Sequence, residues 1–171
     1  MTEDPDLDGP AFVAFLNAAK AYCTEVEAVG AEPPDSADER AMVLGFRARV
    51  AALLAAAVAL PDVEVTTSEI SPSISHEAWS AKFAALDRAL GPAATYWAAL
   101  PTAGTEADVA LVPLADDLAD IWRDLRSALD WLDSGADPAD VLWEWRFGFE
   151  THWGRHATQA LGALHAAAVS S

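Results

Sequence analysis

The chain has 171 residues, 53% of them hydrophobic, and its 27 Asp and Glu against 10 Lys and Arg give a formal net charge of −17. Its length and composition predict one domain with a sizeable core. The charge argues against nucleic acids and anionic membranes as partners, because no basic patch is available to neutralise phosphates. The single cysteine, Cys23, excludes an intrachain disulfide framework, and the N-terminus does not carry a basic and then apolar leader. Both observations predict a cytoplasmic protein.

Helical signals begin near the N-terminus. Residues 1–8 are acidic and are expected to be frayed. Pro10 begins a first helix, because proline is favoured at the first helical position. Ser36 followed by Glu39 has the pattern of a capping box, which predicts a second long helix. The apolar run at 50–60 is too short to span a bilayer and is expected to be buried.

The middle of the chain is predicted to consist of a loop and a third helix. Residues 61–75 lack helical periodicity and are expected to form the loop. The helix should run from His76 to Leu90, with Ser75 as its N-cap and Gly91 as its stop.

The next segment is predicted to contain one short helix and a second loop. Pro92 would open the short helix, which ends near Leu100, and residues 101–112 would form the loop. The apolar VALVPL that closes this segment is assigned as extended coil, because an isolated strand without a partner is unstable. Pro113 then begins a fifth helix that ends near Asp133.

The last predicted helix runs from Asp137 to His165 and has the clearest start signal, an N-cap Asp137 followed by Pro138. It is apolar around most of its circumference, which predicts the central helix of a bundle. Gly154 within it indicates either the close approach of another helix or a bend. The short link at 134–137 predicts an antiparallel hairpin with the fifth helix. The predicted fold is therefore all-α, a single-domain bundle of five to six helices over residues 1–171.

Polar residues on the last two helices are expected to meet in one seam. On the fifth helix, Asp117, Asp120 and Asp124 form a carboxylate ridge beside the apolar stripe. Reflection of the hairpin about its loop sets Asp124 level with Arg146, Asp120 with Glu150, and Asp117 with His152. The predicted polar seam comprises Asp117, Asp120, Asp124, Arg146, Glu150, His152 and His156. The aromatic residues expected to form a pocket beside it are Trp122, Trp145, Phe149 and Trp153.

The histidine pair in this seam has a spacing that permits a shared metal ion. His152 and His156 lie four residues apart, so their rings are neighbours on one helix face. The metalloprotease pattern requires Glu directly after the first His, where Trp153 stands, and the di-iron pattern requires Glu three residues before a His. Neither motif is present. The candidate ligands are Asp117, Asp120, His152 and His156, which by type would suit zinc, iron or manganese.

Three motifs in the second half of the chain are similar to those of a known family. They are DDLADIWRDL at 116–125, WEWRF at 143–147 and HWGRH at 152–156, with Tyr22-Cys23 in the first helix as a further point of likeness. They resemble the bacterial domain of unknown function number 5063 (DUF5063), and the likeness covers most of the chain. The resemblance implies an all-helical bacterial protein and supplies no activity.

Two functions remain open at this point. The first, and the one that we favour from the sequence, is a cytoplasmic binding module without a cofactor, in which the polar seam is an internal support and the partner is basic or apolar. The alternative is a divalent-metal or acid-base site in the seam, of the kind that a hydrolase uses. The sequence predicts neither the oligomeric state nor the ligand.

Overall fold

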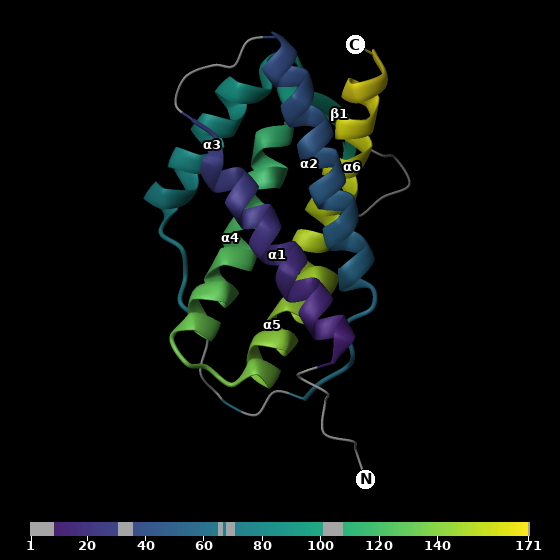
Figure 1. The fold of residues 1–171 in the computed structure, drawn as a ribbon. Coiled ribbons are helices and arrows are strands. Elements are labelled where there is room, and N and C mark those ends of the chain that lie inside the picture. Colours follow the sequence, from purple (N-terminus) through teal and green to yellow (C-terminus); the bar gives the residue numbers. More distant parts are fainter. Residues whose placement is uncertain (1–8, 31–35, 65–66, 68–70, 101–107, 171) are drawn as a thin grey trace.

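The computed structural model describes residues 9–30, 36–64, 67, 71–100 and 108–170, which are mostly helical (Figure 1). The helices are α1 (Pro10–Ala28), α2 (Ser36–Ala57), α3 (His76–Leu90), α4 (Leu114–Asp133), α5 (Pro138–Thr151) and α6 (Trp153–Ser170). A 3₁₀ turn, η1 (Gly91–Ala94), follows α3 and leads into the strands β1 (Thr95–Leu100) and β2 (Asp108–Pro113). The predicted all-α, single-domain bundle is confirmed, with one small hairpin added.

Local capping signals explain where several helices begin and end. The carboxylate of Asp137 accepts from the backbone N–H of Ala139 at 2.9 Å, and the hydroxyl of Ser75 accepts from Ala78 at 3.2 Å. Gly135, just beyond the end of α4, has a φ of 96°, a conformation that favours glycine. The capping role expected of Ser36 lies outside the described side chains, and the expected frayed segment 1–8 lies outside the described residues.

The central helix of the bundle is α4. It packs against α1, α3, α5 and α6 and against both strands, and Figure 1 shows it behind α1 and flanked by the other helices. Leu118, Ile121 and Leu125 on its apolar stripe are completely buried. The prediction that residues 137–165 form the central helix is wrong, because Phe147 on the outer face of that segment remains 49% exposed.

The segment 137–165 is also not one helix, since the chain breaks at His152 between α5 and α6. His152 has φ −141° and ψ −82°, outside the helical region. A Cβ on Gly154 would lie only 2.1 Å from the carbonyl oxygen of Phe149, so this position requires glycine. Of the two interpretations of Gly154, the structure therefore favours the bend, and the close contact is with the end of α5 itself.

Aromatic packing holds this break in place. The indole N–H of Trp153 donates to the carbonyl oxygen of Trp145 at 3.1 Å, and the indole lies against Gly148, where a Cβ would be 2.9 Å from its ring. Phe15 of α1 packs on both Trp145 and Trp153, with ring centroids 5.1 and 6.0 Å apart. All three aromatic side chains are buried, so the break is stabilised by the core around it.

The hairpin corrects the prediction for residues 92–113. The expected short helix up to Leu100 is instead strand β1, and the expected extended coil is strand β2, which pairs with it antiparallel from Thr95↔Pro113 to Leu100↔Asp108. Thr, Tyr and Trp at 95–97 are good strand formers, and each segment supplies the partner that the other was thought to lack. Strand alternation turns Tyr96 toward the bundle and leaves Trp97 70% exposed.

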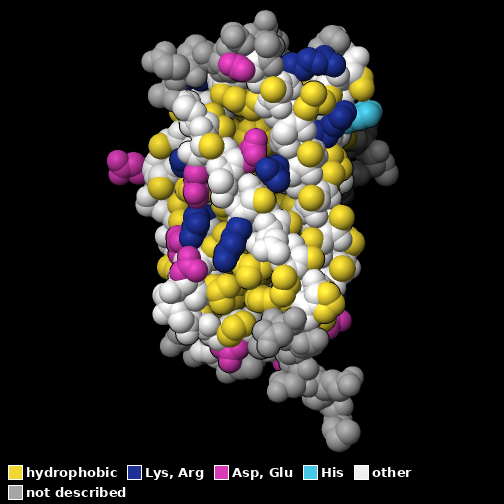
Figure 2. Space-filling view, viewed as in Figure 1, with side chains coloured by type: hydrophobic (Ala, Val, Ile, Leu, Met, Phe, Trp, Pro, Cys, Tyr) yellow, Lys and Arg dark blue, Asp and Glu magenta, His cyan; other side chains and the backbone are white. Residues whose placement is uncertain are grey.

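Two further features concern the surface and the loops. The described residues of 61–75 form neither helix nor strand. Figure 2 shows the face made by α1 and α2, on which charged side chains of both signs are interspersed with apolar ones. Arg49 and Glu25 form an exposed ion pair of 3.3 Å between these helices. Among the described residues, no helix combines the length and the apolar character needed to cross a bilayer.

Candidate functional site

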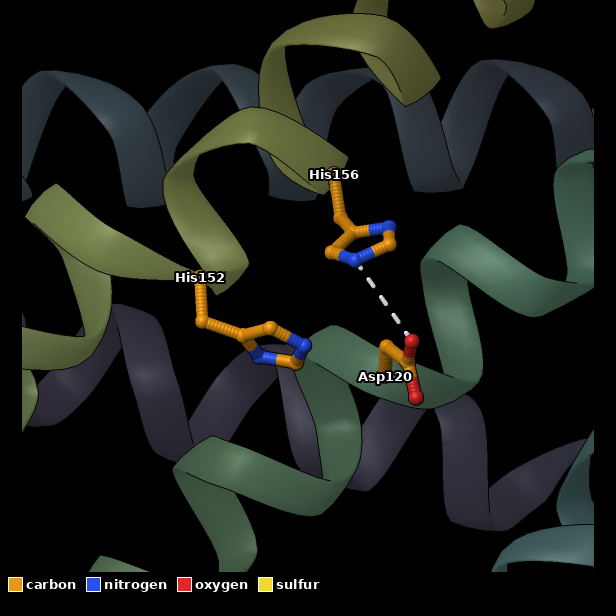
Figure 3. Close-up of side chains that lie close together, drawn as sticks. All are labelled: Asp120, His152 and His156. Atoms are coloured by element: carbon orange, nitrogen blue, oxygen red, sulfur yellow. Dashed lines mark ion pairs between the residues drawn. The ribbon is translucent and has the colours of Figure 1, made fainter. Parts of the chain in front are cut away.

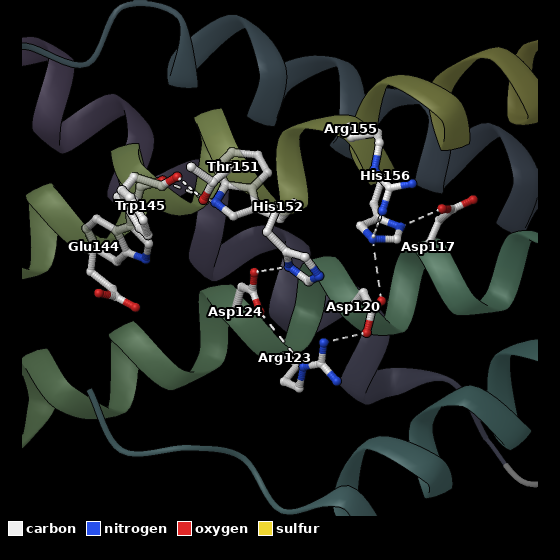
Figure 4. A network of polar contacts seen from close by, with 12 residues as sticks. Asp117, Asp120, Arg123, Asp124, Glu144, Trp145, Thr151, His152, Arg155 and His156 are labelled. Atoms are coloured by element: carbon white, nitrogen blue, oxygen red, sulfur yellow. Dashed lines mark hydrogen bonds and ion pairs between the residues drawn. The ribbon is translucent and has the colours of Figure 1, made fainter. Parts of the chain in front are cut away.

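Two histidine–aspartate pairs join α4 to the start of α6 and to the break before it (Figure 4). Nδ1 of His156 lies 2.7 Å from Oδ1 of Asp117, and both side chains are almost completely buried. Nδ1 of His152 lies 2.6 Å from Oδ2 of Asp124, in a pair that is partly open to solvent. The two rings lie edge to face, with centroids 5.0 Å apart. Each carboxylate therefore fixes the orientation of one imidazole.

The neighbouring Arg155 indicates which ring nitrogen of the buried His156 carries the proton. Nη2 of Arg155 lies 3.3 Å from Nε2 of His156. A guanidinium has no acceptor, so Nε2 must accept this hydrogen bond with its lone pair. The ring proton is then on Nδ1 and is donated to Asp117, so we assign His156 as the Nδ1–H tautomer.

Asp117 is held on its other side by the hairpin. The hydroxyl of Tyr96 in β1 donates to Oδ2 of Asp117 at 2.6 Å. Burial raises the pKa of Tyr96 above its ordinary value, and the hydrogen bond to Asp117 raises it further, so the phenol remains a donor at neutral pH. The carboxylate of Asp117 thus accepts two hydrogen bonds, one from the hairpin and one from His156.

Asp120 completes the group one turn further along α4. Its Oδ1 forms an ion pair with Nη2 of Arg123 at 2.8 Å, while its Oδ2 lies 3.5 Å from Nε2 of His156. One ligand atom each from Asp120, His152 and His156 can be chosen so that all three lie within 4.8 Å of one another. Figure 3 shows these side chains converging between α4 and the start of α6.

The residue types of this group are ones that could hold a divalent metal ion. Two imidazoles and one carboxylate are a common ligand set for non-haem iron, and the same atoms suit zinc or manganese. Bond lengths near 2.1 Å place ligands about 3.4 Å apart, so a pair at the 4.8 Å limit would have to close by about 1.4 Å. Outer partners already orient each ligand: Asp117 for His156, Asp124 for His152 and Arg123 for Asp120. Such partners are typical of metal sites.

The electrostatics of the ridge also favour a cation. The pKa of Asp116 is raised mainly by burial, and then by the charges of Asp120 and Asp117. The charged form of Asp116 is therefore disfavoured by the two neighbouring carboxylates, whereas His156 and Arg123 favour it. A divalent ion beside Asp120 would relieve that repulsion.

A pocket of about 290 Å³ lies next to His152, between α4, α5 and the segment 71–74. Its polar side chains include Asp124, Glu144 and Thr151, and Trp145 and Trp153 form part of its wall. The indole N–H of Trp145 has no hydrogen-bond partner among the described residues. The site therefore has space for a small molecule at its partly exposed end.

The structure brings the predicted seam together in a different register. Asp124 faces His152 rather than Arg146, and Asp117 faces His156. Arg146 instead donates to the carbonyl oxygen of Leu60 at 2.5 Å, with ion pairs to Asp62 and Glu150. Arg146 and Glu150 thus lie outside the group of histidines. His152 therefore lies seven residues, or about two helical turns, further along α4 than the predicted register placed it, at Asp124 instead of Asp117.

Only some of the aromatic residues predicted to form a pocket beside the seam do so. Trp145 and Trp153 line the pocket, whereas Phe149 packs on Trp153 with centroids 5.0 Å apart. Trp122 points to the opposite side of α4, where its indole N–H donates to Glu27 of α1 at 2.9 Å. Its place on the apolar stripe beside the ridge could have indicated this, because it faces away from Asp120.

Sequence reasoning missed three polar residues of the site. Arg155 directly precedes the candidate ligand His156, Arg123 directly precedes Asp124 of the predicted seam, and this adjacency was the available signal. Tyr96 carried no such signal, because it reaches Asp117 only through the unexpected pairing of the two strands.

Comparisons with known proteins agree with the fold and add no activity. The chain is similar to protein BF1032 from Bacteroides fragilis, whose crystal structure matches with a TM-score of 0.77 at 19% identity, over 93% of this chain and 92% of that chain. At this identity the likeness shows a shared fold only. None of the curated proteins matches significantly. The model of a family described as a domain of unknown function (DUF5063) matches residues 9–170, and the chain belongs to that family.

Proposed function

We propose that this protein binds a divalent transition-metal ion between α4 and α6, through Asp120, His152 and His156. One observation carries the proposal: one possible ligand atom each from Asp120, His152 and His156 lies within 4.8 Å of the other two, and each of these side chains is paired with a further residue of the site. Nε2 of His156 lies 3.5 Å from Oδ2 of Asp120 and 3.3 Å from the guanidinium of Arg155, an exposed cation whose place a metal ion could take.

The direct test is ion binding by protein purified without an affinity tag and stripped with a chelator. Calorimetric titration with Zn²⁺, Mn²⁺ and Fe²⁺ should show one site, and the bound ion should raise the melting temperature. Acidification should release the ion, because protons compete for the imidazole nitrogens. Failure of all three ions to bind or to stabilise the protein at neutral pH would overturn the proposal.

Variants localise the ion. His152→Ala and His156→Ala should each weaken binding by more than the roughly 10- to 100-fold that is typical of outer-shell changes. His165→Ala is the matched control, because His165 is exposed near the end of α6. Equal binding by His165→Ala and His156→Ala would place the ion elsewhere.

A second candidate function is the partner-binding module favoured by the sequence, and one surface supports it. The outer face of the β1–β2 hairpin exposes Trp97, Val109 and Leu111, which are 70%, 60% and 54% accessible. Contiguous exposed apolar residues often mark interaction sites. The net charge of −17 favours a partner that is basic around an apolar centre. A cytoplasmic location fits the single Cys23, which is buried.

Site-specific photo-crosslinking tests this second function in the source cells. A photoreactive amino acid at Trp97 should capture a discrete partner, whereas the same group at Val58 should not, although Val58 is 72% exposed. Identical products at both positions would argue against a specific surface on the hairpin.

A further inference from the structure

The geometry points to Arg155 as the receptor for an oxyanion bound to the proposed metal ion. The inference rests on the proposed ion site. It further holds that Arg155 competes with the ion for Nε2 of His156 and is displaced when the ion binds. The guanidinium then becomes available to an anionic ligand that occupies an open position on the ion.

Competition follows from the contact that Arg155 makes. Its Nη2 donates to Nε2 of His156 at 3.3 Å, and that nitrogen has one lone pair. A metal ion needs the same lone pair, so the hydrogen bond and the coordinate bond exclude one another. Among the described residues, His156 is the only hydrogen-bond partner of the Arg155 side chain. Displacement therefore leaves the guanidinium without an internal acceptor.

The displaced guanidinium would stay close to the ion. Arg155 directly precedes the ligand His156 on α6, and Figure 4 shows its side chain beside the imidazole. Arg155 belongs to the exposed residues, so its head can move without disturbing the core. Arg123, the other arginine of the site, is not available in this way, because it pairs with Asp120 at 2.8 Å and with Asp124 at 3.8 Å.

The ligand class follows from these two groups. Three protein ligands leave open positions on a transition-metal ion. A planar guanidinium donates in a fork that matches carboxylate and phosphate oxygens. A ligand that satisfies both the ion and Arg155 is thus an oxyanion, either a carboxylate or a phosphate. The ion and the anion should each strengthen the binding of the other. An anion bound to Arg155 keeps its guanidinium away from Nε2 of His156, which is the atom that the ion needs.

The test measures ion and anion affinity separately in the full chain. Zn²⁺ or Mn²⁺ is titrated into the wild type and into Arg155→Gln, and oxalate or inorganic phosphate is then titrated into each loaded protein. Loss of a charge-assisted hydrogen bond typically changes an affinity about tenfold, and the affinities for the ion and for the anion should change in opposite directions. Arg155→Gln should bind the ion about tenfold more tightly and the anion about tenfold more weakly. Tighter binding of oxalate or of phosphate identifies the carboxylate or the phosphate source.

Two controls separate the contact from a general effect of charge. Arg155→Lys keeps the charge but not the planar fork, so it should lose most of the preference for the anion. Arg49→Gln removes one positive charge from the α1–α2 face and should behave as the wild type. If the ion binds and Arg155→Gln matches the wild type in both titrations, the inference is wrong and the ion site stands. If Arg155→Lys retains full anion affinity, the effect is one of charge alone and the inference also fails. If no ion binds to any protein, the proposed function itself fails.

Discussion

The candidate site has two sides, the carboxylates of α4 and the histidines of the α5–α6 segment, and the fold positions them in different ways. On α4, Asp117, Asp120 and Asp124 project from one uninterrupted helix, so helical spacing alone aligns them. On the other side, His152 lies in a break, and His156 lies one turn into α6. The orientation of these imidazoles depends on the packing that holds the break. The continuous helix α4 fixes the spacing of its carboxylates, whereas the break between α5 and α6 fixes the direction in which the imidazoles point.

The two histidine–aspartate pairs offer the strongest test of this difference. Asp117→Ala should lower the free energy of unfolding by about 2 to 3 kcal/mol, because it leaves the Nδ1–H of buried His156 and the hydroxyl of Tyr96 without an acceptor. Asp124→Ala should cost less than about 1 kcal/mol, because its pair with His152 is partly open to solvent. Urea unfolding of both variants checks the comparison. Equal losses would mean that both pairs experience the same environment.

The break itself can be tested at Gly154. Gly154→Ala should cost about 1 to 3 kcal/mol, because its Cβ would lie 2.1 Å from a backbone oxygen of α5. Gly162→Ala is the matched control on the same helix, where a Cβ meets no atom within 4 Å. This control should gain up to about 1 kcal/mol from helix propensity. A neutral or stabilising effect of Gly154→Ala on the melting temperature would contradict the geometry of the break.

Variants of two tyrosines can separate the effect of the β1–β2 hairpin on ion binding from its effect on stability. Tyr96→Phe should lower the free energy of unfolding by about 1 kcal/mol through loss of its hydrogen bond to Asp117. It should also weaken ion binding, by less than the roughly tenfold of an outer-shell change, because Tyr96 acts on His156 only through Asp117. Tyr22→Phe removes a 2.8 Å hydrogen bond to the carbonyl oxygen of Leu118 on the same helix. This control should cost similar stability and leave ion binding unchanged. If both variants bind the ion equally, Tyr96 does not position His156.

The smallest expected effect concerns Asp116, next to Asp117 on α4. Its pKa is raised in the folded state, mainly by burial, so its ionisation costs stability as the pH rises through that folded pKa. Asp116→Asn should therefore stabilise the protein at pH 7, and the gain should vanish below about pH 4. Solvent screening limits the gain to a few tenths of a kcal/mol. Unfolding curves of Asp116→Asn at both pH values test this prediction. A loss of stability at pH 7 would mean that Asp116 has a favourable partner and would contradict it.

The sequence by itself determined the helical framework and the polar composition of the centre. Asp137 and Ser75 begin helices, and Gly135 follows the end of another, because capping and positive φ are properties of a few neighbouring residues. The carboxylates of α4 and the pair His152 and His156 were identified from helical spacing for the same reason. The short link between α4 and α5 also predicted correctly that these two helices are neighbours.

Only the tertiary structure decided how those residues pair. The break at His152 depends on the packing of Trp153 on Phe15 and against Gly148, and Phe15 is far away in the chain. That packing turns His152 to Asp124 and His156 to Asp117. Strand pairing likewise carries Tyr96 to Asp117. Periodicity describes one element at a time, whereas the direction of a side chain at a break or in a hairpin is set by contacts between elements, which local spacing does not contain.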